Sequence, residues 1–314
     1  MNLEIQTFDT GYGGANFTAM YLLKLREGYA VVETGTAPGI PGFLEKAEKQ
    51  GISLDQIRWI ILTHIHLDHA GGASLLLKSC KNAKIFVHPR GARHLIDPSR
   101  LVASAKQVYG ESEFARLYGT IEAIPEGRVR TFQDQEVFAD QGQDVFRFHH
   151  TRGHANHHFV VEWIPERTLF TGDTFGLVYP EIQELARRQG RALYAIPSTS
   201  PTDFDAEEAI LSIDRILALR ARDFYPTHYG QIFDFAETAR QLKDWIWVSK
   251  LLQDQARSEL QAGSSFEEVC SRLEKKLLEN LNRNWPSCPD RVVEILALDF
   301  KLNAQGITFS ASKS

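Results

Sequence analysis

The chain has 314 residues, of which 43% are hydrophobic and 24% are charged, and its formal net charge is −5. This composition is typical of a folded globular protein with one sizeable core, and it argues against a disordered or fibrous chain. The mildly acidic balance disfavours a general nucleic-acid-binding role. The three cysteines, Cys80, Cys270 and Cys288, have no paired spacing, which argues against a zinc knuckle or a disulfide scaffold and favours a reducing compartment.

The N-terminal residues have no basic segment followed by an apolar segment, so they do not resemble a signal peptide. No apolar run approaches the roughly 20 residues that a membrane helix needs. We therefore expect a cytoplasmic protein that binds neither membranes nor nucleic acid.

The first half of the chain alternates predicted strands and helices. Alternating apolar residues over 17–33 predict a β-hairpin, and residues 41–51 have helical spacing. The apolar run 59–62 predicts a strand buried on both faces. Further along, we expect a helix over 73–79, a buried strand over 84–88, helical pieces over 91–119, and two or three short strands over 129–148.

In the second half, strands are predicted over 159–163 and 168–171. Residues 175–203 are rich in Pro, Gly, Ser and Thr, which predicts a long excursion of the kind that often forms a lid. A helix is expected over 205–220, with Asp203 or Asp205 as its N-cap.

From about residue 233 onward, helical periodicity continues without an intervening strand pattern, over 234–262, 265–283 and 291–302. We therefore predict a β-rich α/β catalytic domain over residues 1–232 and a helical C-terminal extension over residues 233–314. The extension is expected to pack on the core or to form a homodimer contact.

The strongest chemical signal is a group of ligand-type side chains directly after the buried strand at 59–62. His64, His66, Asp68 and His69 lie within six residues. A single loop histidine is usually a solvated polar residue, whereas four ligand-type residues in so short a segment predict a metal site. Imidazole and carboxylate together suit zinc, iron or manganese.

Three later segments repeat the arrangement of an apolar strand that leads to a ligand-type residue next to or near glycine. These residues are His154, Asp173 and His228. Glycine lets the backbone turn sharply or approach a ligand closely. Three such segments in addition to the first group strengthen the prediction of one shared site.

On these residues the sequence resembles the metallo-β-lactamase superfamily, in particular its glyoxalase-II-like hydrolase branch. The resemblance covers residues from about 16 to 232 and rests on four segments: THIHLDHAGG at 63–72, TRGHANHH at 151–158, FTGDT at 170–174 and PTHYG at 226–230. It implies an α/β fold, the four-layer αββα sandwich, in which two sheets pack face to face with helices outside and the active site lies at one edge.

The resemblance also implies a ligand set for two divalent transition-metal ions. His64, His66 and His154 would hold the first ion, Asp68, His69 and His228 the second, and Asp173 would bridge both. Two such ions about 3.5–4 Å apart need a bridging anion, which Asp173 and a bridging hydroxide would provide. Asp68 would act catalytically by orienting that hydroxide. Zinc is the expected metal, with iron and manganese as alternatives.

The sequence departs from the family pattern at two positions. Arg152 stands where relatives often have proline, and we expect it to be a surface arginine rather than a contact for an anionic substrate. Glu33 stands where relatives usually have aspartate, and we expect it to support the ligands or the local structure.

Two further residues are candidate substrate-binding residues. His158 follows His154 by four residues and would contact substrate or orient a ligand. Tyr229 is adjacent to His228 and would donate a hydrogen bond to substrate, with simple packing as the alternative. The neighbouring histidines His149, His150 and His157 have no assigned role.

The favoured function is a binuclear metal-dependent hydrolase that acts on a small-molecule thioester, ester or lactone. A di-iron oxygen-binding or redox protein is the first alternative. His66 argues against it, because flavin-dependent redox relatives have glutamate at that position. A phosphodiesterase is the second alternative, although such relatives usually add a cap domain or a basic surface, and neither is evident here.

Overall fold

A computed structural model describes residues 4–199 and 203–313. Two compact units are present, and the chain passes between them several times. The first unit comprises Met1–His150, His157–Gly172 and Ala221–Gln231. The second comprises Thr151–Asn156, Asp173–Arg220 and Ile232–Ser314. The functional boundary expected at residue 232 stays a prediction.

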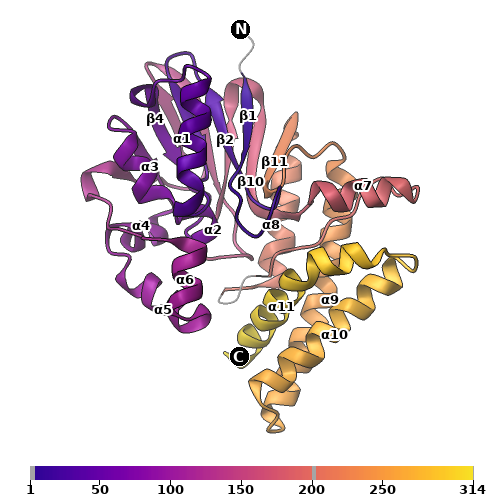
Figure 1. The fold of residues 1–314 in the computed structure, drawn as a ribbon. Coiled ribbons are helices and arrows are strands. Elements are labelled where there is room, and N and C mark those ends of the chain that lie inside the picture. The colour runs from indigo at the N-terminus through magenta and orange to yellow at the C-terminus, as the bar shows by residue number, and fades with distance from the viewer. Residues whose placement is uncertain (1–3, 200–202, 314) are drawn as a thin grey trace. The chain divides into compact units, whose positions relative to one another are not determined.

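The first sheet begins as an antiparallel meander and continues with parallel strands (Figure 1). Its strands, in spatial order, are β1 (Ile5–Asp9), β2 (Ala19–Lys24), β3 (Tyr29–Val32), β4 (Ile57–Ile61), β5 (Lys84–Phe86) and β6 (Val129–Arg130). The predicted hairpin is β2–β3, and the predicted buried strand is β4, which lies inside the sheet. The strand expected over 84–88 ends earlier, at Phe86, and Pro89 instead begins a helix.

The second sheet has the order β11-β10-β9-β8-β7. Its strands are β7 (Val137–Asp140), β8 (Gln143–His150), β9 (Phe159–Trp163), β10 (Thr168–Leu177) and β11 (Asp223–His228). Strand β10 is longer than expected, and it crosses from the first unit to the second between Gly172 and Asp173.

Aromatic side chains from both sheets fill the space between them. Phe148 is fully buried, and its ring lies 4.0 Å from that of Phe132 and 5.0 Å from that of Phe86, centroid to centroid. A separate apolar cluster lies on the outer face of the first sheet, where Phe43 and Leu76 come from two of the helices. Helices in this unit are α1 (Ile40–Lys49), α2 (Leu67–Ala70), α3 (Ala73–Ser79), α4 (Pro89–Ile96), α5 (Ser99–Tyr109) and α6 (Glu111–Tyr118).

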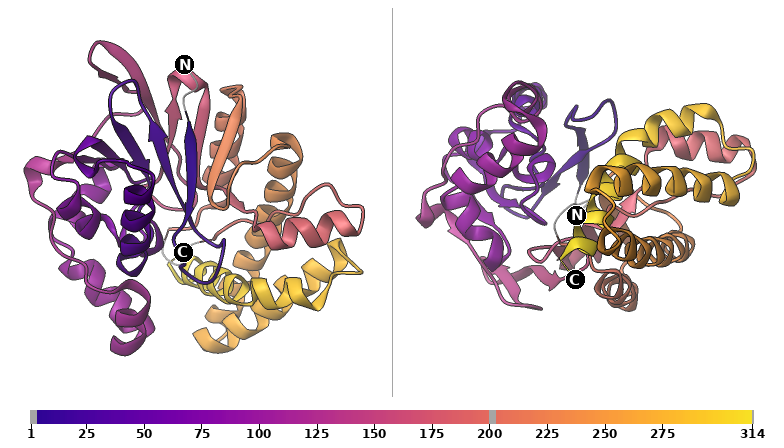
Figure 2. Two further views of the ribbon diagram at one scale, coloured as in Figure 1. Left: turned by 45° about the horizontal axis from the view of Figure 1, so that its top comes forward. Right: turned by 90° about the horizontal axis from the view of Figure 1, so that it is seen from below.

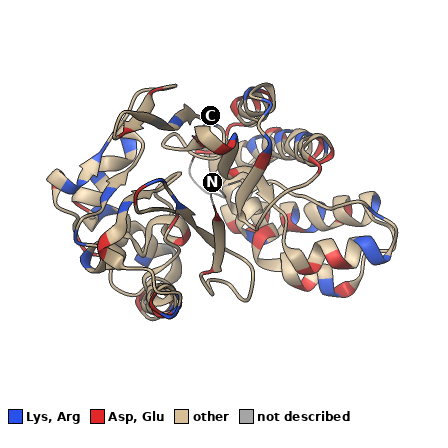
Figure 3. Ribbon diagram, turned by 90° about the horizontal axis from the view of Figure 1, so that it is seen from above, with Lys and Arg blue, Asp and Glu red and all other residues tan. Residues whose placement is uncertain are grey.

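The second unit is mainly helical, with α7 (Pro180–Arg188), α8 (Ala206–Ala218), α9 (Phe235–Gln261), α10 (Phe266–Asn284) and α11 (Asp290–Ser312). Asp205 is the N-cap of α8 and accepts a hydrogen bond from the Glu208 amide. Helices α9, α10 and α11 contact one another (Figure 2). Their basic and acidic residues are interspersed (Figure 3). Arg240 pairs with both Glu237 and Asp244.

The excursion expected over 175–203 is more ordered than predicted. It contains the end of β10 and the whole of α7, while residues 200–202 lie outside the described part of the chain. Pro180 contributed to the expectation of a loop, but it occupies the first turn of α7, where proline has no amide hydrogen to lose. Helix α11 is also longer than the predicted 291–302.

The predicted α/β sandwich with a helical C-terminal region is confirmed. Within the described residues, no helix has both the length and the apolar character needed to cross a membrane.

The packing between the sheets predicts a large stability difference between two substitutions. We expect Phe148→Ala to lower the free energy of unfolding by about 3–5 kcal/mol, because it leaves a cavity among buried rings. Leu251→Ala, at a side chain that is 69% exposed, should change it by less than about 0.5 kcal/mol. Urea unfolding followed by tryptophan fluorescence checks this. Equal midpoints for the two variants would contradict the assignment of Phe148 to the core.

Candidate metal centre

The loop after β4 begins the site. Parallel strands β3 and β4 end at the same edge of the first sheet, and the Glu33 amide donates to the Ile61 carbonyl oxygen there, at 2.9 Å. His64 and His69 are both fully buried. The single turn of α2 contains Asp68 and His69, so both follow the end of β4 within a few residues.

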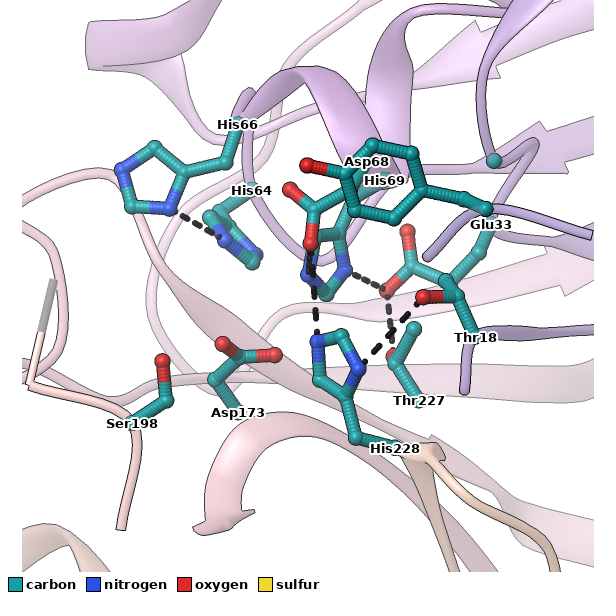
Figure 4. A network of polar contacts seen from close by, with 12 residues as sticks. Thr18, Glu33, His64, His66, Asp68, His69, Asp173, Ser198, Thr227 and His228 are labelled. Carbon is teal, nitrogen blue, oxygen red and sulfur yellow. Dashed lines mark hydrogen bonds and ion pairs between the residues drawn. The ribbon is translucent and has the colours of Figure 1, made fainter. Parts of the chain in front are cut away.

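Three side chains of the first unit form a group that could hold a metal ion (Figure 4). They are Asp68, His69 and His228, and their nearest ligand atoms all lie within 4.8 Å of one another. The Nε2 atoms of His69 and His228 each lie 3.6 Å from Asp68 Oδ2. His228 comes from the end of β11, so the sheets bring together residues that are far apart in the sequence.

The other ring nitrogen of each histidine has a fixed hydrogen-bond acceptor. His228 Nδ1 lies 2.8 Å from the Phe17 carbonyl oxygen, and His69 Nδ1 lies 3.2 Å from Glu33 Oε1. A carbonyl oxygen only accepts, so Nδ1 of His228 must be the protonated nitrogen. Its Nε2 atom is then left with a lone pair, which is the state that a metal ligand needs.

Glu33 links three segments of the first unit. Its carboxylate is fully buried and accepts hydrogen bonds from the Thr63 hydroxyl and from the Thr227 hydroxyl, the latter at 3.1 Å. The same oxygen faces His69 Nδ1. Glu33 therefore contacts one candidate ligand and two neighbouring segments, and its role in supporting metal ligands stays a prediction.

His64 and His66 lie next to this group. His64 Nε2 is 2.8 Å from His66 Nδ1, and the His64 ring centroid is 3.9 Å from that of His69. Five of the seven predicted ligands thus gather in the first unit.

The second unit contains the other two predicted ligands, His154 and Asp173, as a pair. His154 Nε2 lies 3.4 Å from Asp173 Oδ2, and both side chains are buried. His154 Nδ1 lies 2.9 Å from the Ser198 carbonyl oxygen, which again fixes the proton on Nδ1. A cavity of about 20 Å³ lies beside the pair, lined in part by Pro197 and Ser198.

These separations match what a metal ion requires. Two ligand atoms bound at about 2.1 Å to one tetrahedral ion lie about 3.4 Å apart. The three histidine–carboxylate separations are 3.4, 3.6 and 3.6 Å, which is longer than an ordinary hydrogen bond. Imidazole and carboxylate donors at this spacing fit a divalent transition metal.

The other residues singled out in the sequence, His158, Tyr229 and Arg152, differ in how deeply they are buried. His158 is 1% exposed, and its ring centroid lies 5.0 Å from that of His64. Tyr229 packs against the cluster between the sheets, and burial raises its pKa to about 12. Arg152 is exposed, as expected. The substrate-binding roles of His158 and Tyr229 stay predictions.

The sequence did not single out two tyrosines near Asp68, Tyr109 and Tyr118, or Tyr12, which contacts Tyr118. The Tyr12 and Tyr118 hydroxyl oxygens are 2.9 Å apart, and the Tyr118 ring packs against that of Tyr109. Burial raises the pKa of Tyr109 and of Tyr118, and the charge of Asp68 adds to both increases. Both phenols therefore stay protonated and can donate hydrogen bonds.

A weak sequence signal for two of these tyrosines exists. Tyr109 and Tyr118 each end a helix directly before a glycine with positive φ, Gly110 and Gly119. A Tyr-Gly pair therefore marks a helix C-terminus here. The pair does not reveal that the two helix ends lie near Asp68.

Comparison with known proteins supports a family assignment. The model of the "Metallo-beta-lactamase superfamily" matches residues 13–228. The metallo-beta-lactamase fold-containing protein ST1585 of Sulfurisphaera tokodaii is 30% identical over 183 residues, which are 57% of this chain and 63% of that protein. The chain thus spans less than two thirds of this relative's length.

Solved structures show the same fold. The ST1585 crystal structure, from Sulfolobus tokodaii, aligns with a TM-score of 0.60 at 25% identity, covering 76% of this chain and 85% of ST1585. The metallo-beta-lactamase family protein TTHA1429 from Thermus thermophilus aligns with a TM-score of 0.63 at 18% identity, covering 99% and 92%. The chemotaxis sensor ODP, solved as a peroxy diiron species, aligns with a TM-score of 0.51 at 18% identity, covering 77% and 90%.

The segment that matches the family model covers more than half of the chain, and it contains all seven predicted ligand positions, from His64 to His228. The chain belongs to the metallo-beta-lactamase superfamily.

Proposed function

We propose that the protein is a binuclear metal-dependent hydrolase that acts on a thioester, ester or lactone. The arrangement of three histidines supports this most strongly. In His69, His154 and His228, Nδ1 faces a fixed acceptor and Nε2 lies 3.4 to 3.6 Å from a carboxylate oxygen. A hydrogen bond that fixes the proton on one ring nitrogen leaves a lone pair on the other, and this is characteristic of histidines that bind metal. The assignment to the glyoxalase-II-like branch stays a prediction.

In this proposal His154 and Asp173 complete the site that the first unit begins. Chain continuity supports this joining. Asp173 directly follows Gly172 in β10, and a Cβ atom on Gly172 would overlap His158 Nε2 and lie 2.6 Å from Thr63 Oγ1. His154 precedes His158 by only four residues. We assign His64, His66 and His154 to one ion, Asp68, His69 and His228 to the other, and Asp173 to both.

Divalent ions bound by these residues would lower the pKa of water toward about 7 and polarise a carbonyl oxygen. The protein's own contribution is orientation. Asp68 is 23% exposed at its side chain, so its carboxylate can accept a hydrogen bond from the attacking water and direct it. Glu33 and the Phe17 carbonyl hold the rings of His69 and His228 in place.

The tyrosines Tyr12, Tyr109 and Tyr118 are the proposed substrate contacts. Tyr109 and Tyr118 are neutral donors close to Asp68, Tyr12 contacts the Tyr118 hydroxyl, and Tyr12 and Tyr109 are partly exposed. Neutral phenols favour a substrate with a carbonyl, hydroxyl or carboxylate oxygen beside the reacting bond. His158 and Tyr229 remain further candidates. A homodimer through the C-terminal helices also stays a prediction.

A di-iron redox function is the second candidate. The likeness to the fold of the sensor ODP, which was solved as a peroxy diiron species, favours keeping it. Histidine and carboxylate donors accept iron as well as zinc or manganese.

Metal analysis combined with activity tests the main proposal. We expect close to two transition-metal ions per chain after metal-replete expression, and turnover of a thioester, ester or lactone in a panel that also contains phosphodiesters. Asp68→Asn should lower kcat by about 10²–10⁴-fold, because the carboxylate that directs the water is lost. Asp140→Asn, which alters a carboxylate that pairs with Arg58, is the matched control and should keep full turnover.

Three results would count against this reading. A metal-free protein would overturn the whole proposal. Bound iron with visible absorbance and no hydrolysis would favour the di-iron alternative, and turnover of phosphodiesters alone would favour a phosphodiesterase.

The role of Glu33 gives a second prediction. Glu33→Gln removes the buried charge that accepts from Thr63, Thr227 and His69, so we expect metal affinity to fall by about 10–100-fold. Glu162→Gln is the matched control, because Glu162 also pairs with a histidine, His149, but not with a predicted ligand. Titration against a chromophoric chelator measures both. Unchanged affinity in the Glu33 variant would refute the supporting role.

The tyrosines give a third prediction. Tyr109→Phe removes one hydroxyl and keeps the ring, so we expect KM to rise by about 3–10-fold with kcat nearly unchanged, as for one lost substrate hydrogen bond. Tyr29→Phe, at the opposite end of β3 from Glu33, should leave both constants unchanged. If both variants behaved like wild type, the tyrosines would not contact substrate.

A further inference from the structure

We propose that the C-terminal helix α11 positions the metal-ligand candidate His154 through Asn303, which holds the loop 197–199 in place. This makes Asn303 a positioning residue. The proposal rests on the assignment of His154 as a ligand under the proposed function, and every contact that supports it lies in the second unit.

Asn303 binds the loop on both sides of Ser198. Its Oδ1 atom accepts from the Thr199 amide at 2.8 Å, and its Nδ2 atom donates to the Pro197 carbonyl oxygen at 3.0 Å. The Thr199 hydroxyl also donates to the Asn303 carbonyl oxygen, at 3.3 Å. Because residues 197 and 199 are both held, the peptide that bears the Ser198 carbonyl has little freedom to rotate.

The Ser198 carbonyl oxygen is the acceptor for His154 Nδ1, at 2.9 Å. It determines which ring nitrogen has the proton and how the ring is oriented. The opposite nitrogen, Nε2, faces Asp173 Oδ2 at 3.4 Å. The contacts therefore run from Asn303 through the loop to the His154 nitrogen that would bind metal.

Asn303 is a polar residue on the apolar face of α11. It is 7% exposed and lies on the buried face of the helix with Phe300, Ala304 and Ile307. A polar side chain on an apolar face is tolerated when its hydrogen bonds are made, and those of Asn303 go to the loop. The helix is also anchored further along, where the Ser310 hydroxyl donates to the Phe204 carbonyl oxygen at 2.9 Å.

Asn280 provides a matched control on the neighbouring helix α10. It is also 7% exposed, and its Nδ2 atom has no hydrogen-bond partner among the described residues. Asn280→Ala removes a buried amide of the same size at a comparable depth, without altering the 197–199 loop.

Two measurements on the full chain test the proposal. The first uses metal-free protein and follows exchange of the His154 Nδ1 proton by NMR, with the signal assigned by its absence in His154→Gln. We expect Asn303→Ala to speed this exchange at least about tenfold, because the acceptor is no longer held. The second is zinc titration against a chelator, in which one binding step should weaken by about 10–100-fold. Asn280→Ala should leave both readouts at wild-type values.

Asn303→Asp keeps an acceptor for the Thr199 amide and loses the donor to Pro197, so intermediate values are expected. It also provides the test if the alanine variant does not fold. Wild-type proton exchange in a folded Asn303 variant would overturn the proposal, as would equal effects of Asn303→Ala and Asn280→Ala. If wild-type protein bound none of zinc, iron and manganese, the proposed function would fail, whereas the proton measurement would still decide the role of Asn303.

Discussion

The arrangement of the candidate metal ligands in the first unit depends on one buried carboxylate, that of Glu33. Glu33 accepts hydrogen bonds from Thr63 and Thr227 and faces His69, so it joins the ends of β3, β4 and β11. Burying an ionised carboxylate costs several kcal/mol unless such partners compensate. Glu33 also adopts a left-handed backbone conformation, with φ of 64°, which is strained for a residue other than glycine. Strain of this kind persists where the surrounding structure enforces it, often at functional sites.

Both units orient their histidines in the same way. In each case a rigid oxygen holds Nδ1: a carboxylate for His69, a backbone carbonyl for His228, and a backbone carbonyl for His154. Two of these acceptors are main-chain atoms, so their positions depend on how the loops around Phe17 and Ser198 are held. In our proposal, residues remote from the candidate ligands influence the ligand geometry, which would give the C-terminal helix α11 a functional connection as well as a packing role.

The phenols near Asp68 differ from the ligand residues in what they can do. They are neutral and remain protonated, because burial and the Asp68 carboxylate both disfavour the phenolate. They therefore offer directed hydrogen bonds without adding charge to a site that already has several carboxylates. In the proposed function, selectivity among oxygen-rich substrates would come from these donors, while the histidines and aspartates would hold the metal ions that activate water.

The sequence alone determined the ligand candidates, the hairpin at 17–33 and the buried strand at 59–62, because each is a local pattern of residue types and spacing. Only the tertiary structure placed Glu33 between two threonines, Tyr109 and Tyr118 near Asp68, and Ser198 against His154. Ser198 and His154 are 44 residues apart, and Asn303 is 104 residues from Thr199. A backbone carbonyl has no residue-type signature, and a buried asparagine resembles any other polar helix residue. These contacts exist because packing brings distant segments together, and no local pattern encodes them.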